Sequence, residues 1–315
     1  MIKHFYYKIL ILMCLIALFG ISSSITYAVN FVNRSSSVNT LQEERKDVKD
    51  GEMKWFLVNG GWAELSKYAF KLDEDHYWNC KIGSIQEFFR VGNDMALAFM
   101  ADMEIVVDKH SQIMNFNPRA VFWELGALLS FKYSFGYLSF GYSHRCKHEI
   151  DRLANDLDQG RVFIYDSFAL RYMTNPIRLW SSGDMSGSIQ FIANNNYFLV
   201  LDGKSPKDTI ETIMDSLSLS AYINLLRYKD DWSVYFNTGI EPTAYGDGED
   251  FKSRNKLDID RIKPDWFMEL GYSVMSNTSK FDFFVLYQYL YDTGVPDRPR
   301  SAFLMSFGIR YLPNF

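Results

Sequence analysis

From about residue 54 to the end of the chain, apolar and polar side chains alternate with a period of two. In residues 94–107 every odd position is apolar, whereas the even positions include Asp94, Asp102 and Glu104. A β-strand points successive side chains to opposite faces, so this pattern produces one apolar face and one small or polar face. The alternation recurs in 119–133, 216–226, 231–240, 265–275 and 281–292. The sequence therefore predicts an all-β fold.

Twelve strands can be placed on this pattern. They are 54–68, 77–91, 94–107, 119–133, 137–148, 161–172, 187–201, 214–228, 231–240, 265–275, 281–292 and 302–312. The connections alternate between short turns and long polar segments, of which 241–264 is the longest, as they do in transmembrane barrels. An even number of strands puts both ends on the periplasmic side. Residues 161–201 alternate poorly, which leaves ten or fourteen strands open.

Either a soluble sandwich or a membrane barrel could carry such strands. Aromatic residues make up 17% of the chain and cluster toward the strand ends, as the interfacial girdles of membrane barrels do. Strands of about 10 to 14 residues also match the ~9–11 needed to cross a bilayer at a tilt. The sequence thus favours one antiparallel, up-and-down transmembrane β-barrel over residues 54–315.

The first 28 residues have the features of a secretory signal peptide. Lys3 and Lys8 precede the apolar run 9–21, and small and polar residues lead to a cleavage site after Ala28. A retained anchor is the alternative, but the run is shorter than the ~20 residues that a helical span needs. Cleavage would change the net charge from −5 to −7. Residues 29–53 are polar and predict a flexible leader, and we expect the mature protein in the bacterial outer membrane.

The acidic net charge and the absence of a basic stripe argue against nucleic acid as a partner. Three cysteines in 315 residues exclude a disulfide-rich scaffold. No motif predicts a cofactor or a metal-binding loop.

The final strand carries an additional signal. Apolar residues occupy every second position of this strand, and the chain ends on Phe315. This pattern resembles the assembly signal of Gram-negative outer-membrane proteins, although Pro313 departs from it. The resemblance implies that the barrel assembly machinery is a partner, with outer-membrane lipid and lipopolysaccharide as surroundings.

One cluster stands out as a candidate site, because His144, Cys146 and His148 lie within five residues of each other. On a strand these three side chains share a face, and that face continues the apolar face of the preceding residues. The strand order makes this strand run outward. The cluster is therefore expected near the outer-leaflet rim, facing lipid.

The segment His144-Arg145-Cys146 resembles the His-x-Ser pair of two families of outer-membrane acyl hydrolases, the phospholipases A and the lipid A deacylases. The resemblance implies that His144 is the base and that Cys146 occupies the position of the nucleophile. Cys in place of Ser and Lys147 in place of Asn are departures from the motif. Glu149 or Asp151 could orient a histidine, as a triad requires. We therefore take His144, Cys146, His148 and Asp151 as candidate catalytic residues.

Three other interpretations of the cluster stay open. It could be a polar cap at the rim, with Lys and Arg contacting lipopolysaccharide phosphate. It could bind a transition metal, although three alternating residues spread over ~13 Å. Cys146 could also pair with Cys80, although about three strands separate the two.

The predicted interior also bears on function. Asp102, Glu104, Arg119, Glu124 and Lys132 fall on inward positions and predict a lumenal salt-bridge network. Large apolar residues are expected to fill much of the remaining interior: Phe122, Leu128, Phe284, Leu286 and Leu290. A non-channel structural or surface-binding barrel is thus favoured, with a lipid hydrolase or a narrow pore as alternatives.

Overall fold

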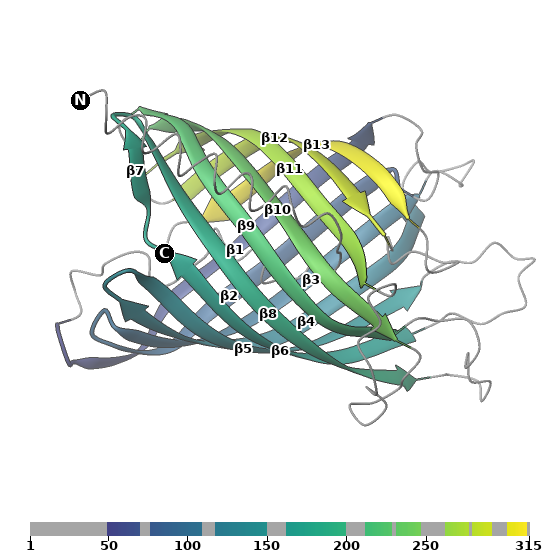
Figure 1. Cartoon of the computed structure of the whole chain (residues 1–315), viewed down its shortest axis with the longest axis horizontal. Helices are drawn as coiled ribbons and strands as arrows, with labels where there is room; N and C mark the ends of the chain where they lie inside the picture. Colours follow the sequence, from purple (N-terminus) through teal and green to yellow (C-terminus); the bar gives the residue numbers. More distant parts are fainter. Residues whose placement is uncertain are drawn as a thin grey trace, which may run out of the picture.

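The computed structural model describes residues 49–69, 76–108, 117–149, 162–199, 212–228, 231–246, 262–276, 279–291 and 301–313. These residues form a closed barrel of tilted strands (Figure 1). The strands are β1 (Met53–Ala69), β2 (Trp78–Val91), β3 (Met95–Asp108), β4 (Asn117–Tyr133), β5 (Gly136–Glu149), β6 (Val162–Thr174), β7 (Ile177–Trp180), β8 (Gly183–Leu199), β9 (Thr212–Tyr228), β10 (Trp232–Gly246), β11 (Ile262–Met275), β12 (Ser279–Leu290) and β13 (Ala302–Pro313). In the described ranges no helix has the length and apolar character to cross a membrane.

The barrel closes because the first and last strands pair. Ala63 on β1 lies opposite Tyr311 on β13, and their antiparallel register continues to the pair Ala69 and Met305. Elsewhere each long strand pairs with its sequence neighbours, and β6 pairs directly with β8. The wall therefore holds twelve long strands, with the short β7 as an addition. This arrangement confirms the predicted up-and-down barrel and its twelve strands.

Two parts of the wall differ from the expected boundaries. The segment 241–264 is not one long connection, because β10 continues to Gly246 and β11 begins at Ile262. In this extension Glu241, Thr243, Ala244 and Tyr245 are buried, so the strand stays packed past Pro242. The four-residue β7 was also not predicted. It pairs with the beginning of β8 at the left-hand end of Figure 1, next to a break after Thr174 where Pro176 cannot continue the ladder.

The outer face of the barrel is apolar along most of the strands. Phe283 is 52% exposed, whereas its neighbour Phe284 is 4% exposed, and this contrast follows the period of two. Aromatic rings contact each other near the short turns, for example Tyr133 with Phe135 and Tyr228 with Trp232. A second group lies toward the long connections, where the rings of Trp266, Tyr287, Phe303 and Tyr289 meet. Two aromatic zones at opposite ends of an apolar wall are typical of a barrel that crosses a bilayer.

The inner face combines polar residues with aromatic rings that lie over glycines. Tyr235 on β10 is the register partner of Gly271, and Phe284 on β12 is the partner of Gly308. A Cβ atom added at Gly271 would lie 2.2 Å from the Tyr235 ring, and one at Gly308 would lie 2.3 Å from the Phe284 ring. Only glycine leaves room for these rings to lie flat against the wall.

Candidate functional site

The predicted cluster lies on the outer face of β5, between β4 and β6. Tyr142 is exposed, and the side chains of His144, Cys146 and His148 follow it with the same parity. His144 has Leu125 of β4 and Asp166 of β6 as its register partners. Its side chain is 44% exposed. The structure thus places the three predicted residues on one outward row.

Asp166 forms a hydrogen bond with the histidine. The Nδ1 atom of His144 lies 2.8 Å from Oδ1 of Asp166. The hydroxyl of Tyr142 donates a hydrogen bond to the same oxygen at 3.0 Å. Since a carboxylate accepts hydrogen bonds, Nδ1 of His144 carries a proton, and in the neutral ring Nε2 is left as a hydrogen-bond acceptor. This is the arrangement by which an acid orients a basic histidine.

Sequence reasoning did not identify Asp166. Glu149 and Asp151 are the acids expected from sequence because they are close to His144, and among the described residues the carboxylate that contacts His144 comes from the adjacent strand. Asp151 and the side chain of Glu149 lie outside the described residues. One signal in the sequence could have indicated Asp166. It is a carboxylate that shares alternate positions of its strand, and therefore one face, with the exposed Phe168 and Leu170. A charged residue on a lipid-facing row is costly and calls for a partner.

Cys146 and His148 are close to His144 in sequence but do not join this hydrogen-bonded group. Among the described residues, no hydrogen bond connects the Cys146 thiol to His144 or to His148. Cys146 lies opposite Trp123 of β4. Both Cys146 and Cys80 are free thiols, so the two do not form a disulfide.

Two of the alternative interpretations can be compared with the structure. Arg145 does not contact lipid headgroups at the rim, because it points into the barrel and lies 3.7 Å from Glu104 and 3.8 Å from Glu124. A strand alternates its side chains, so Arg145 must face away from His144 and Cys146. Within the described ranges, no three His, Cys, Asp or Glu side chains form a group that could hold a metal ion.

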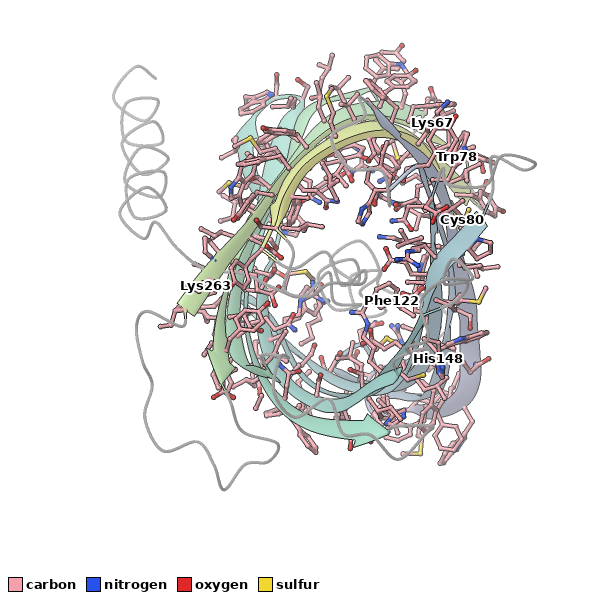
Figure 2. The ribbon with its side chains drawn as sticks, turned by 90° about the vertical axis from the view of Figure 1, so that its right-hand side faces the viewer. Lys67, Trp78, Cys80, Phe122, His148 and Lys263 are labelled. Carbon is pink, nitrogen blue, oxygen red and sulfur yellow. The ribbon has the colours of Figure 1, made fainter. Side chains whose placement is uncertain are left out.

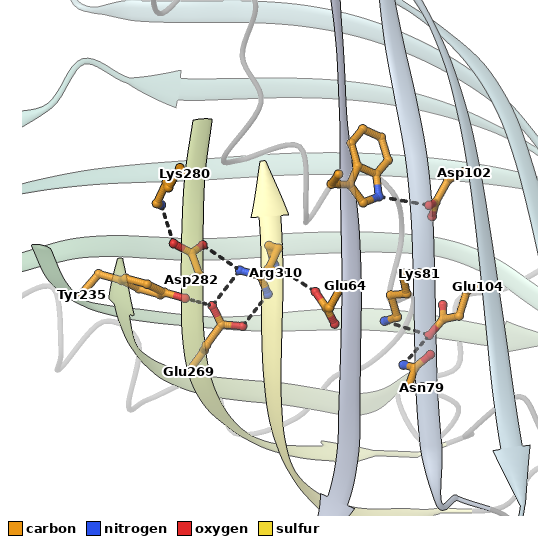
Figure 3. Close-up of polar contacts among 11 residues, drawn as sticks. Glu64, Asn79, Lys81, Asp102, Glu104, Tyr235, Glu269, Lys280, Asp282 and Arg310 are labelled. Atoms are coloured by element: carbon orange, nitrogen blue, oxygen red, sulfur yellow. Dashed lines mark hydrogen bonds and ion pairs between the residues drawn. The ribbon is translucent and has the colours of Figure 1, made fainter. Parts of the chain in front are cut away.

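The interior contains a network centred on Arg310 of β13 (Figure 3). The guanidinium group donates to Glu64 at 2.9 Å and to both carboxylate oxygens of Glu269, at 3.1 and 2.9 Å. Asp282 lies 3.6 Å away, and Tyr235 donates to Glu269 at 2.8 Å. Glu64 belongs to β1, so Arg310 bridges the seam at which the barrel closes.

A second network links β2, β3, β4 and β5. Glu104 accepts from Lys81 at 2.7 Å and from Asn79 at 2.9 Å, and Arg145 lies between Glu104 and Glu124. Phe122 projects into the interior (Figure 2), and its ring packs against the Arg145 guanidinium. The predicted lumenal network is thus present around Glu104 and Glu124.

Two other members of the predicted network, Asp102 and Arg119, also contact neighbouring side chains. Asp102 accepts a hydrogen bond from the Trp62 indole at 3.1 Å. Arg119 lies 3.9 Å from Asp108, next to a register shift between β3 and β4. Arg145, which was not assigned to the network from sequence, makes the connection between the two central glutamates.

The closed wall, its apolar outer face and its polar inner face together define the class of this protein, which is an outer-membrane-type β-barrel. No family model and no curated protein matches the chain. Solved barrels do resemble it in structure. LpxR from Salmonella typhimurium is 8% identical, with 80% of this chain and 99% of LpxR covered and a TM-score of 0.46.

Two further barrels show a likeness of the same degree. The outer membrane phospholipase dimer of Salmonella typhi with bound calcium is 8% identical, with 87% and 95% of the two chains covered and a TM-score of 0.46. The translocator domain of the autotransporter NalP from Neisseria meningitidis is 12% identical, with 90% and 95% covered and a TM-score of 0.40. These likenesses extend no further than the barrel architecture.

Proposed function

We propose that the protein is an integral barrel of the Gram-negative outer membrane with a closed interior, and that it serves as a structural or surface-binding protein. One observation carries this proposal: several large inward side chains have almost no contact with solvent. Tyr235 is 1% exposed, and Leu128 and Arg171 are each 4% exposed. Side chains that line a water-filled pore would be much more accessible, and a barrel of twelve strands has a narrower interior than the porins of ~16–18 strands.

Several apolar inward residues contribute to this filling. They come from β1, β2, β3, β4 and β13 and form one cluster: Trp62, Ile85, Ala98, Met100, Leu128 and Leu312. The Arg310 network lies beside this cluster, on β1, β11, β12 and β13, and its charged groups are paired with one another. Ion pairs held in this way offer no free charge to a permeating ion.

Single-channel recording in planar bilayers tests the closed interior. The purified full-length protein should give no steady conductance steps, and a twelve-stranded porin reconstituted in parallel serves as the positive control. Stable, concentration-dependent steps from the wild-type barrel would overturn this proposal and support the narrow pore.

A second candidate function is acyl-ester hydrolysis at the outer leaflet, and the His144–Asp166 contact specifically favours it. In this reaction the Cys146 thiol would give its proton to Nε2 of His144, and the sulfur would attack the ester carbonyl of a lipid. The alcohol would leave with that proton, and water would then hydrolyse the thioester. Asp166 would keep the imidazole oriented throughout. The side chain of Cys146 would have to turn toward His144 for the first step.

Assays with phospholipid and lipid A in detergent micelles test this candidate. We expect ester cleavage by the wild-type protein, its loss in Cys146→Ala and His144→Ala, and a reduction in Asp166→Asn by a factor of roughly 10² or more, in line with general acid–base contributions. Cys80→Ala is the matched control, since Cys80 is the other free thiol and lies on β2. Cleavage that is absent, or that survives the His144 and Cys146 substitutions, would exclude the hydrolase.

Lipopolysaccharide and the barrel assembly machinery also belong to the proposal as partners. In support of a lipid contact, Lys67 lies over the rings of Tyr77 and Trp78, toward the long-connection end of β1 and β2. In support of the assembly signal, Phe303, Phe307 and Ile309 of β13 all face outward. Phe315 itself lies outside the described residues.

A further inference from the structure

Asp166 is a charged group on an outer wall that is mostly apolar in the described strands. It lies on β6 between residues whose side chains face lipid, and Phe168 and Leu170 on the same row are both exposed. Placing a carboxylate on the lipid-facing side of a barrel is unfavourable, although the cost falls toward the interface. An ionisable residue in such a place is a functional-site candidate by default.

The height of Asp166 on the wall matches the outer headgroup region. Its partner His144 lies five residues before the end of β5, which has 14 residues. About ten residues of a tilted strand suffice to cross the hydrocarbon core. Tyr133 and Phe135 mark the interface at the turn between β4 and β5, so the surplus length of β5 extends past the opposite interface. His144 and Asp166 are therefore near the outer boundary of the core.

The hydrogen bonds at Asp166 leave acceptors free. Tyr142 and His144 both donate to Oδ1, and among the described residues nothing donates to Oδ2. In the neutral ring, Nε2 of His144 is a second acceptor without a described partner. The site thus presents two hydrogen-bond acceptors, Oδ2 of the Asp166 carboxylate and Nε2 of the neutral imidazole, next to the apolar side chains of Leu125 and Phe168.

We propose that Tyr142, His144 and Asp166 form a binding site for a lipid with a primary ammonium headgroup, such as phosphatidylethanolamine. The ammonium group would donate hydrogen bonds to Oδ2 of Asp166 and to Nε2 of His144. Its positive charge would compensate the charge of the carboxylate. The acyl chains would lie along the apolar outer wall. This inference rests on the proposed membrane location, and it would name the substrate class if the hydrolase candidate also holds.

Native mass spectrometry of the full-length protein tests the site. The protein would be released from nanodiscs that contain equal amounts of phosphatidylethanolamine and phosphatidylglycerol. Wild type should retain phosphatidylethanolamine preferentially, and Asp166→Asn should weaken that preference about tenfold, because the charge that attracts the ammonium is removed. Tyr142→Phe, which keeps the charge and removes one hydrogen bond, should weaken it less.

Two controls isolate the effect. Asp102→Asn removes a carboxylate from the interior, and Tyr272→Phe removes a hydroxyl from an equally exposed outward tyrosine on β11. Both should retain the wild-type lipid preference, and every variant should keep the heat-modifiable migration of a folded barrel. All measurements use the Cys146→Ala background, so loss of hydrolysis does not affect them. No headgroup preference in the wild type, or an unchanged preference in Asp166→Asn, would overturn the site.

Discussion

At the residue scale, Arg310 is the centre of one of the two interior polar networks. It is bound to Glu64 and Glu269 and lies near Asp282, so one cation balances carboxylates from three other strands. Lys280 lies 3.3 Å from Asp282 and compensates part of that charge. Removal of one partner of a buried ion pair leaves the other charge uncompensated, which costs more than the pair itself contributes.

We therefore expect Arg310→Ala to destabilise the folded barrel by about 3–5 kcal/mol. The measurement is the temperature at which the heat-modifiable band converts to the unfolded one on a gel. Arg310→Lys keeps the charge but loses the two-oxygen contact with Glu269, so its conversion temperature should fall between those of Ala and wild type. An Ala variant as stable as wild type would show that the network has no role in closing the seam.

The sequence indicates which residues face inward but not which of them meet. Alternation placed Glu104 and Glu124 inside the barrel and His144 outside it, because parity depends only on position along one strand. The partners of these residues depend on the register between neighbouring strands. Alternation along one strand does not give that register. Asp166 and Arg310 were missed for this reason, since both act through residues on other strands.

At the scale of the strand, the pairing of aromatic rings with glycines shapes the inner wall. Tyr235 cannot move easily away from Gly271, because its hydroxyl is bonded to Glu269 and its ring stacks on Tyr222 at 5.1 Å. A side chain at position 271 would have to displace this ring. Gly187 on β8 is different, since a Cβ atom there would meet only the Ser220 carbonyl oxygen at 3.6 Å.

We expect Gly271→Ala to destabilise the barrel by about 1–3 kcal/mol, the usual range for overpacking. Gly187→Ala is the matched control and should change stability little. Urea unfolding in detergent, followed by tryptophan fluorescence, would measure both variants. Equal stabilities for the two variants would mean that the Tyr235 ring does not lie against Gly271 as described.

Strand positions were predictable from alternation, and departures occurred where proline interrupts the pattern. The expected strand ended at residue 240, before Pro242, yet β10 continues because Pro242 lies opposite Pro264 and Thr243 resumes the ladder. Pro176 has the opposite effect at the end of β6, where the wall continues through the separate strand β7. Whether a proline ends a strand depends on its hydrogen-bond position, which sequence alone does not give.

At the scale of the whole molecule, the two faces of the wall imply two environments. The outer face needs lipid, because large apolar side chains on nearly every strand would otherwise contact water. The inner face needs its network, because buried charges must be paired. The candidate site is the place where the outer face is not apolar, because His144 and Asp166 are polar side chains on that face.

Site-directed spin labelling along β12 tests the orientation of the wall most directly. Single cysteines would be placed at each position from 281 to 287 in a protein whose three native cysteines are replaced by alanine. In reconstituted vesicles, labels at 281, 283, 285 and 287 should be accessible to lipid-soluble oxygen, and labels at 282, 284 and 286 should not. Equal accessibility at odd and even positions, or access of a water-soluble quencher to the odd positions, would contradict the membrane-spanning barrel.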